Sequence, residues 1–209
     1  MVDLSPEITY GQYHLIIDPL IFNYISAVER PMLLVPSAGV GWEDVSRTFK
    51  TFRVPEEKFE KILRVIEPGK EVHKDLPPYV VKWEPKSPLE DFEELIQLED
   101  SLFESTGHPP LRFIGVDRVA HYHGQEGTVT LANLDVTRTK KLKSLTLWLF
   151  KAIYPELLKR LIPLASIHMK ISQKHGCLLL YCVKPRTPLY VVEQDLSKGY
   201  PLPKLLPIE

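Results

Sequence analysis

Three side chains in one short segment, Asp117, His121 and His123, have the types and spacing of metal ligands. Asp117 follows an apolar, strand-like segment, and open α/β sheets bind ligands at the carboxyl ends of their strands. A carboxylate there can hold Mg²⁺ or act as a base. If the strand continues, both imidazole rings point to one face and can share a metal with Asp117. The alternative is a buried aspartate bonded to a loop amide or paired with Arg112 or Arg118, beside two histidines in an exposed turn.

A second group, Arg138, Lys140, Lys141 and Lys143, is the densest basic cluster of the sequence. Such side chains can contact the phosphates of DNA or RNA, with an affinity that falls as salt rises. The first 110 residues carry 20 acidic and 11 basic side chains, and the remaining residues carry 7 and 15. We therefore expect an anionic partner at this cluster, or else attraction between the two halves. The isoelectric point of about 6.7 argues against a general nucleic-acid binder.

A third pattern, Asp75 followed by Glu84-Pro85-Lys86, loosely resembles the charged cluster of metal-dependent nucleases. That chemistry needs the glutamate and the lysine on a strand, so that both side chains reach the metal. Pro85 has no amide hydrogen for a strand ladder, so the match is poor. A metal-dependent hydrolase or nuclease that uses Asp117 and the two histidines remains an alternative function.

Other catalytic motifs are missing from the sequence. Gly69-Lys70 is preceded by Arg64 where a phosphate loop needs glycine. Cys177 and Cys182 lie in an apolar, strand-like segment, and we expect two buried thiols that point to opposite faces and form no disulfide. No Gly-x-Ser-x-Gly elbow exists. We expect no cofactor. The missing phosphate loop and the missing nucleophile motif argue against an enzyme.

Strand-like and helix-like segments alternate along the chain. Continuous apolar runs bounded by proline or glycine predict buried strands, and apolar spacings of three and four residues predict helices. The expected strands are 13–17, 32–35, 62–66, 79–83, 111–116, 167–171, 176–183 and 189–193, and the expected helices are 20–29, 43–52, 55–61, 88–105, 140–154 and 156–162. This alternation predicts an α/β three-layer sandwich with a mostly parallel sheet and an antiparallel C-terminal edge.

The helix that begins at residue 88 has the clearest boundaries. Ser87 can cap it, Pro88 suits its first position, and Glu90 completes a capping box. Gly107 is expected to end it. Acidic side chains lie opposite its apolar residues, so we expect a helix at the surface.

The composition, with 44% hydrophobic and 25% charged residues, is typical of a folded globular protein. We expect one domain over residues 1–199 and a proline-rich extended tail over 200–209. No apolar segment is long enough for a membrane span, and the two cysteines suit a reducing cytoplasm. The 19 prolines, with few Asn, Gln, Cys and Met residues, are typical of a thermophile.

The order of elements resembles the RecA/KaiC-like ATPase core, in which a first strand leads to a phosphate loop and a helix. Segment 14–17 is similar to that first strand, segment 31–35 to the second and segment 62–66 to the third. Segment 113–117 resembles the Walker B strand, and 177–183 with 189–193 resemble the closing hairpin. The expected helix at 20–29 follows 14–17 almost directly, as if the phosphate loop had been removed.

Because that loop is missing, the resemblance implies a protein that does not bind ATP in the manner of the family. Members without the loop act as structural or regulatory partners of active paralogues or of DNA. We therefore expect a non-catalytic binding or regulatory protein. Its expected partner is a second copy or a RecA-like paralogue, with DNA or RNA in addition and no membrane. The alternatives are the metal-dependent hydrolase and a purely structural subunit of a larger assembly.

Overall fold

The fold is taken from a computed structural model, which describes all residues except 10, 11, 14, 15, 20–29, 52–54, 70–75, 152, 153, 198, 200 and 209. The strands are β1 (Val2–Leu4), β2 (Met32–Val35), β3 (Leu63–Pro68), β4 (Val80–Trp83), β5 (Leu111–Gly115), β6 (Thr146–Lys151), β7 (His168–Lys174), β8 (Cys177–Lys184), β9 (Tyr190–Asp195) and β10 (Leu202–Pro207). The helices are α2 (Trp42–Thr51), α3 (Glu56–Ile62), α4 (Pro88–Thr106), α5 (Val116–Leu142) and α6 (Pro155–Leu161), followed by the short 3₁₀ helix η1 (Ile162–Leu164). Gln12, Tyr13 and residues 16–19 are also helical.

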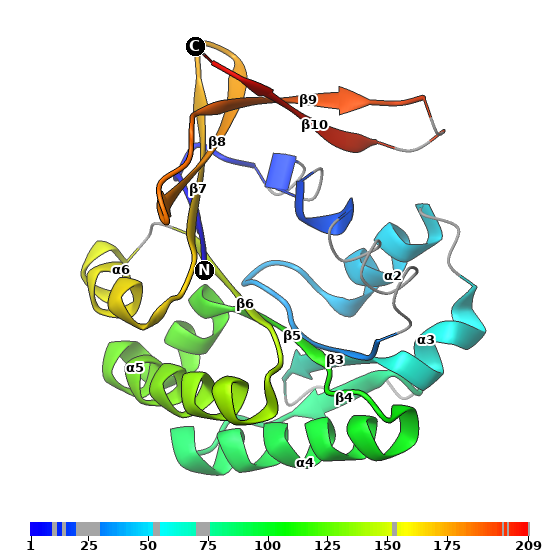
Figure 1. The fold of residues 1–209 in the computed structure, drawn as a ribbon. Coiled ribbons are helices and arrows are strands. Elements are labelled where there is room, and N and C mark those ends of the chain that lie inside the picture. The colour runs from blue at the N-terminus through cyan, green and yellow to red at the C-terminus, as the bar shows by residue number, and fades with distance from the viewer. Residues whose placement is uncertain are drawn as a thin grey trace.

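All ten strands belong to one sheet, in the order β10-β9-β8-β7-β1-β6-β5-β2-β3-β4. Strands β1 to β7 pair in parallel, and β8, β9 and β10 add to β7 as antiparallel strands. The expected mostly parallel sheet with an antiparallel C-terminal edge is therefore confirmed. The extended residues after position 200 form β10, the edge strand beside β9 (Figure 1).

Helices cover both faces of the parallel part of the sheet (Figure 1). Side chains of α2, α3 and residues 16–17 form the core on one face. Side chains of α4, α5 and α6 form two core clusters on the other face. This is the three-layer α/β sandwich that the sequence predicts. None of the helices within the described residues is long and apolar enough to cross a bilayer.

The first strand lies earlier in the chain than expected. Residues 16–19 are helical, so the expected strand at 13–17 is wrong, and the expected helix at 20–29 lies outside the described residues. The strand beside β6 and β7 is β1, which is only three residues long. A short apolar run gives the same signal in a buried helix as in a buried strand, so the pattern at 13–17 could not separate the two.

The helix expected at 140–154 is also wrong, because Thr146–Lys151 forms β6 between β1 and β5. Both faces of β6 are covered by core. Trp148 and Phe150 lie in the cluster with α5 and α6, and Leu149 lies in the opposite cluster. A strand buried on both faces has a continuous apolar sequence that resembles a buried helix.

The expected capping box at the start of α4 is confirmed. The Ser87 side chain accepts a hydrogen bond from the Glu90 amide, and the Glu90 carboxylate accepts one from the Ser87 amide. Gly107 ends the helix in the left-handed conformation, with φ 73°, which glycine adopts without steric cost.

Replacing Ser87 with alanine should lower the free energy of unfolding by about 1 kcal/mol, because the first amides of α4 lose their acceptor. Urea denaturation measures the change. Ser101→Ala, at an exposed position in the middle of the same helix, is the matched control and should leave stability unchanged or slightly higher. Equal losses in the two variants would contradict the capping role.

Candidate functional site

The carboxyl ends of the parallel strands define the candidate site, because ligands bind at this edge in open α/β folds. The chain leaves β1, β2, β3 and β5 at this edge. In the RecA/KaiC-like arrangement the phosphate loop follows the first strand, so the loop after β1 occupies that place. The loop therefore does not follow residue 17, as the resemblance implied, because residues 16–19 are helical.

The loop after β1 supplies its own helix cap. The Thr9 hydroxyl accepts a hydrogen bond from the Gln12 amide at 3.3 Å, and the Gln12 side chain accepts one from the Thr9 amide at 2.9 Å. The amide of Tyr13 donates to the Thr9 carbonyl, which begins the helix. Residues 5–13 contain one glycine and no lysine. Within the described residues, this loop therefore offers neither the lysine nor the glycine-rich amides of a phosphate loop.

Two carboxylates accept hydrogen bonds from amides in and next to the loop after β2, residues 37–41. The Ala38 amide donates to Asp117 Oδ2 at 3.0 Å, and the Trp42 amide, at the start of α2, donates to Glu67 Oε2 at 3.0 Å. Gly41 donates to the side chain of Asp44. An anion bound at this loop and helix start would need the same amides. These amides already donate to carboxylate oxygens of the chain itself.

Arg118 holds the same loop from its carbonyl side. Its guanidinium donates to the carbonyls of Ser37, at 2.9 Å, and Val40, and it lies 3.6 Å from Glu67. Asp117 and Arg118 are both buried. The structure therefore has the arrangement that the sequence left open as an alternative, a buried aspartate bonded to a loop amide.

Gly115 allows this loop to approach β5. A Cβ atom at position 115 would lie 2.5 Å from Ser37 Cα and 2.8 Å from the carbonyl carbon of Pro36. Both are backbone atoms, so a side chain at this position forces a shift of the main chain. The close contact aligns Ala38 with Asp117.

We expect Gly115→Ala to destabilise the fold by about 1–3 kcal/mol, as overpacking does elsewhere. The clash also moves Ala38 away from Asp117, so the Ala38 amide should exchange its hydrogen faster than in the wild type. Chemical denaturation and amide hydrogen exchange measure the two effects. Wild-type stability together with an unchanged exchange rate would show that the contact is not tight.

Burial controls the ionisation of the two carboxylates. Burial raises the pKa of Asp117, and the hydrogen bond from the Ala38 amide opposes this shift. Burial also raises the pKa of Glu67, and the nearby Arg118 opposes that shift. Both carboxylates are therefore held at a cost in solvation, which their hydrogen bonds to the loop amides reduce.

The raised pKa of Asp117 makes a prediction about pH. A carboxyl that binds its proton more tightly in the folded state stabilises the fold at low pH and loses that contribution as pH rises through the folded pKa. Asp117→Asn keeps an oxygen acceptor for Ala38 but cannot ionise. Relative to this variant, the wild type should lose stability as pH rises from about 4, the unfolded value.

Denaturation midpoints of both proteins between acid and neutral pH test this expectation. Glu126→Gln is a control of opposite sign, because the hydrogen bond from Arg160 lowers the pKa of Glu126. Relative to Glu126→Gln, the wild type should lose stability as pH falls. A difference between wild type and Asp117→Asn that stays constant with pH would contradict the assignment.

The two histidines lie on α5, so the expected continuation of the strand through them is wrong. His121 is exposed and packs against the ring of Tyr122, whereas the side chain of His123 is buried, with Nε2 at 2.8 Å from Asp91 Oδ2. Among the described residues, no group of three or more His, Cys, Asp and Glu side chains is placed to hold a metal ion. The strand geometry behind the expected metal site is lost, and metal binding at Asp117, His121 and His123 stays a prediction.

The basic cluster is divided between two environments near the end of α5. Arg138 Nε donates to Glu99 Oε2 at 2.9 Å, and the same guanidinium contacts Asp100. Lys140 and Lys141 are exposed. The charge of Arg138 is thus offset by α4, and an anionic partner for this cluster stays a prediction.

The nuclease-like residues do not form a cluster in the described part of the chain. Asp75 lies outside the described residues, and Lys86 forms an ion pair with Glu94. The expectation of two buried thiols is wrong for Cys177, which is exposed, while Cys182 is half-buried and both are free. The reason is that β8 belongs to the antiparallel extension, where few side chains are fully buried.

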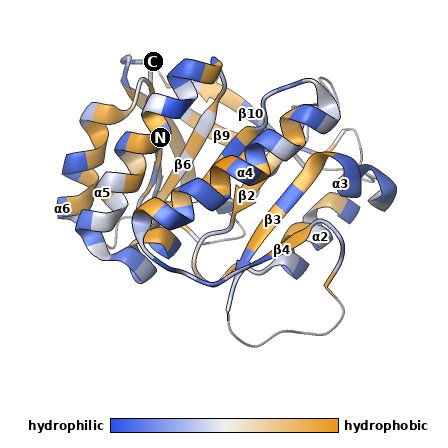
Figure 2. Cartoon of the chain, turned by 90° about the horizontal axis from the view of Figure 1, so that it is seen from below, coloured by the Kyte–Doolittle hydropathy of each residue, from blue (hydrophilic) through white to orange (hydrophobic). Residues whose placement is uncertain are grey.

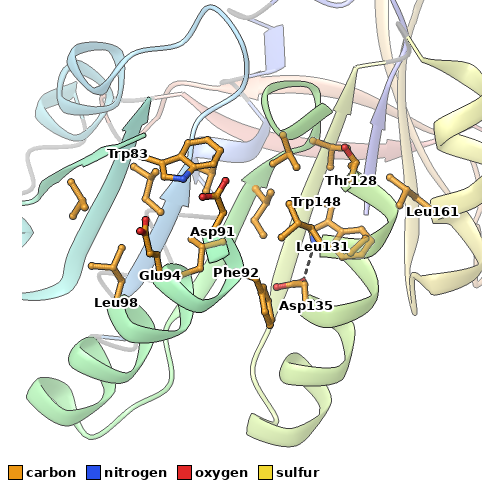
Figure 3. A pocket seen from close by; sticks show the side chains of 18 of the residues that line it. Trp83, Asp91, Phe92, Glu94, Leu98, Thr128, Leu131, Asp135, Trp148 and Leu161 are labelled. Carbon is orange, nitrogen blue, oxygen red and sulfur yellow. Dashed lines mark hydrogen bonds between the residues drawn. The ribbon is translucent and has the colours of Figure 1, made fainter. Parts of the chain in front are cut away.

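A cavity of about 70 Å³ lies between α4, α5 and the sheet. Its lining is mostly apolar and includes Trp83, Phe92, Leu98, Leu131, Trp148 and Leu161 (Figure 3). Its buried carboxylates already have partners. Asp135 accepts a hydrogen bond from Trp148 at 2.9 Å, and Asp91 accepts one from the Lys86 amide at 3.0 Å. The mostly apolar lining suits an apolar group.

Sequence reasoning missed Thr9, Gln12 and Glu67. A signal was present for each of them. Thr9 and Gln12 have the spacing of a capping box, and Glu67 directly follows the predicted strand at 62–66. A helix start at this point is incompatible with the strand expected at 13–17.

Comparison with known proteins supports the fold. No protein-family model matches the chain, and no curated protein sequence matches it. The KaiC-like protein PH0186 of the hyperthermophilic archaeon Pyrococcus horikoshii OT3 has a similar structure, with a TM-score of 0.67 and 12% identity over 97% of this chain and 88% of that chain. The uncharacterized protein PH0321 of Pyrococcus horikoshii, solved in complex with an unknown peptide, has a TM-score of 0.69 and 13% identity over 100% of this chain and 91% of that chain. The chain therefore has a KaiC-like fold, as its order of elements predicts.

Proposed function

We propose that this chain is a non-catalytic protein of KaiC-like fold that acts by binding another protein. One observation carries the proposal. At the carboxyl edge of the sheet, the amides of Gln12, Ala38 and Trp42 already have acceptors from the chain itself, namely Thr9, Asp117 and Glu67.

A nucleotide would have to displace these groups. Its phosphates would compete with Asp117 and Glu67 for the amides of Ala38 and Trp42. They would also be repelled by either carboxylate when it is ionised. Two like unit charges 4 Å apart repel by about 4 kcal/mol at the effective dielectric constant of a protein surface. The loop after β1 has no lysine to offset this repulsion, and the guanidinium of Arg118 is already bonded to the carbonyls of Ser37 and Val40.

Binding of a protein or peptide suits the remaining surface better. PH0321, of similar fold, was solved with a bound peptide, which supports this kind of partner. Addition of a strand to β10 is disfavoured. The Ile208 amide donates to Leu189 beside β9, so by strand alternation Pro203 and Pro207 face the open edge, where neither offers an amide hydrogen. A partner is therefore expected to contact side chains rather than this strand edge.

Thermal unfolding in the presence of ATP and Mg²⁺ tests the non-catalytic part of the proposal. A ligand present at 100 times its dissociation constant would stabilise the protein by about 2.7 kcal/mol. We expect no rise in melting temperature with millimolar ATP and Mg²⁺, and no release of phosphate. Mg²⁺ with sulfate controls for general ionic effects. A rise that depends on ATP concentration, or steady hydrolysis, would overturn the proposal.

A further inference from the structure

Helix α4 has an unusual charge pattern for a helix at the surface. Its 19 residues include seven acidic side chains and no lysine or arginine. The helix lies along the outside of the molecule, where hydrophilic and hydrophobic residues alternate on it (Figure 2). Its exposed charge is therefore of one sign along its whole length.

An apolar stripe follows the same exposed side. Leu89, Ile96 and Phe103 are seven residues apart, so they lie on nearly one line along the helix, over about 21 Å. Leu89 is 55% exposed and Phe103 is 46% exposed, and Ile96 is half-buried. Leu102, which faces the core, lies about a third of a turn away from this line, and the buried Phe92 lies between the two. We call these three residues the α4 stripe.

Acidic side chains lie along one side of the α4 stripe. Glu93, Asp100 and Glu104 are exposed, helical spacing puts them beside the stripe, and Asp100 also contacts Arg138. Glu104 lies in the last turn, which contains no basic residue. Negative charge at a helix C-terminus is unfavourable because it adds to the negative end of the helix dipole. This arrangement lowers the stability of the free helix and suits a cation supplied from outside.

The helix is held firmly enough to present a fixed surface. Its start is closed by the capping box of Ser87 and Glu90. Near its end, the buried Glu99 is bound to Arg138 and lies 3.7 Å from the buried Arg112. A rigid apolar stripe loses little conformational entropy when a partner binds.

We propose that the α4 stripe binds a basic amphipathic helix of a partner protein, with leucine-like residues against Leu89, Ile96 and Phe103 and lysine or arginine against the acidic side chains. Helices pack in this way when apolar residues recur every seven positions beside charged ones. This inference rests on the proposed function as a protein-binding chain and names its partner. A second copy of α4 would bring the exposed Glu93, Asp100 and Glu104 against the same acidic side chains, and an anionic membrane or nucleic acid would be repelled.

A synthetic peptide helix tests the inference. The probe carries leucine at every seventh and intervening fourth position and lysine on both sides, with a fluorescent label for anisotropy. At physiological salt, the full chain should bind it saturably, and the same peptide with glutamate in place of lysine should not bind. In Leu89→Ser/Phe103→Ser, binding should weaken at least about tenfold, because two apolar contacts are lost.

Two further variants separate stripe binding from general attraction of a basic peptide. Ile167→Ser/Leu196→Ser removes two equally exposed apolar side chains outside α4 and should bind as the wild type does. Glu93→Lys/Glu104→Lys should reverse the preference, so that the glutamate peptide binds better. Circular dichroism verifies that each variant is folded. Equal binding by the two serine variants, or no binding by the wild type, would overturn the inference, and neither result bears on the ATP experiment.

Discussion

The start of a helix leaves amide hydrogens without partners inside the helix, and each needs an acceptor. In nucleotide-binding α/β proteins, phosphate supplies acceptors at the carboxyl edge of the sheet. Here the chain supplies acceptors itself. Thr9 accepts from the Gln12 amide after β1, Asp117 accepts from the Ala38 amide in the loop after β2, and Glu67 accepts from the Trp42 amide at the start of α2. The fold is KaiC-like, but in this chain these hydrogen bonds hold the loops at the carboxyl edge in place. Arg118 also holds the loop after β2, because it donates hydrogen bonds to the carbonyls of Ser37 and Val40.

A buried ionic network on the opposite side of the sheet explains how a strongly acidic helix stays in place. Arg112 of β5 lies 3.0 Å from Asp135 of α5 and 3.7 Å from Glu99 of α4, and Arg138 also binds Glu99. Burial raises the pKa of Asp135, although Arg112 opposes the shift. Breaking one member would leave a buried charge unpaired, which is costly. The network uses the basic residues near α4 internally, so its outer surface remains acidic.

The sequence predicted the sandwich, the antiparallel edge and α4 with its caps, because these depend on local signals such as Ser87, Glu90 and Gly107. It failed where burial on both sides removes periodicity. For this reason the continuous apolar sequence of β6 predicted a helix. Strand β1 has only three residues, too few to show the alternation of a strand. The hydrogen bond between the Ala38 amide and Asp117 could not be predicted, because the two residues are 79 positions apart in the chain. That pairing depends on the order of β2 and β5 in the sheet.

The central claim is that the amides of Gln12, Ala38 and Trp42, at the carboxyl edge of the sheet, are already hydrogen-bonded within the chain. Their signals in a nitrogen-15 correlation spectrum report on it directly, and the informative ones are Gln12, Ala38 and Trp42. During titration with ATP and Mg²⁺, we predict that these three signals stay where they are. A saturable shift of any of them, with the rest of the spectrum unchanged, would mean that phosphate reaches the site and would contradict the account.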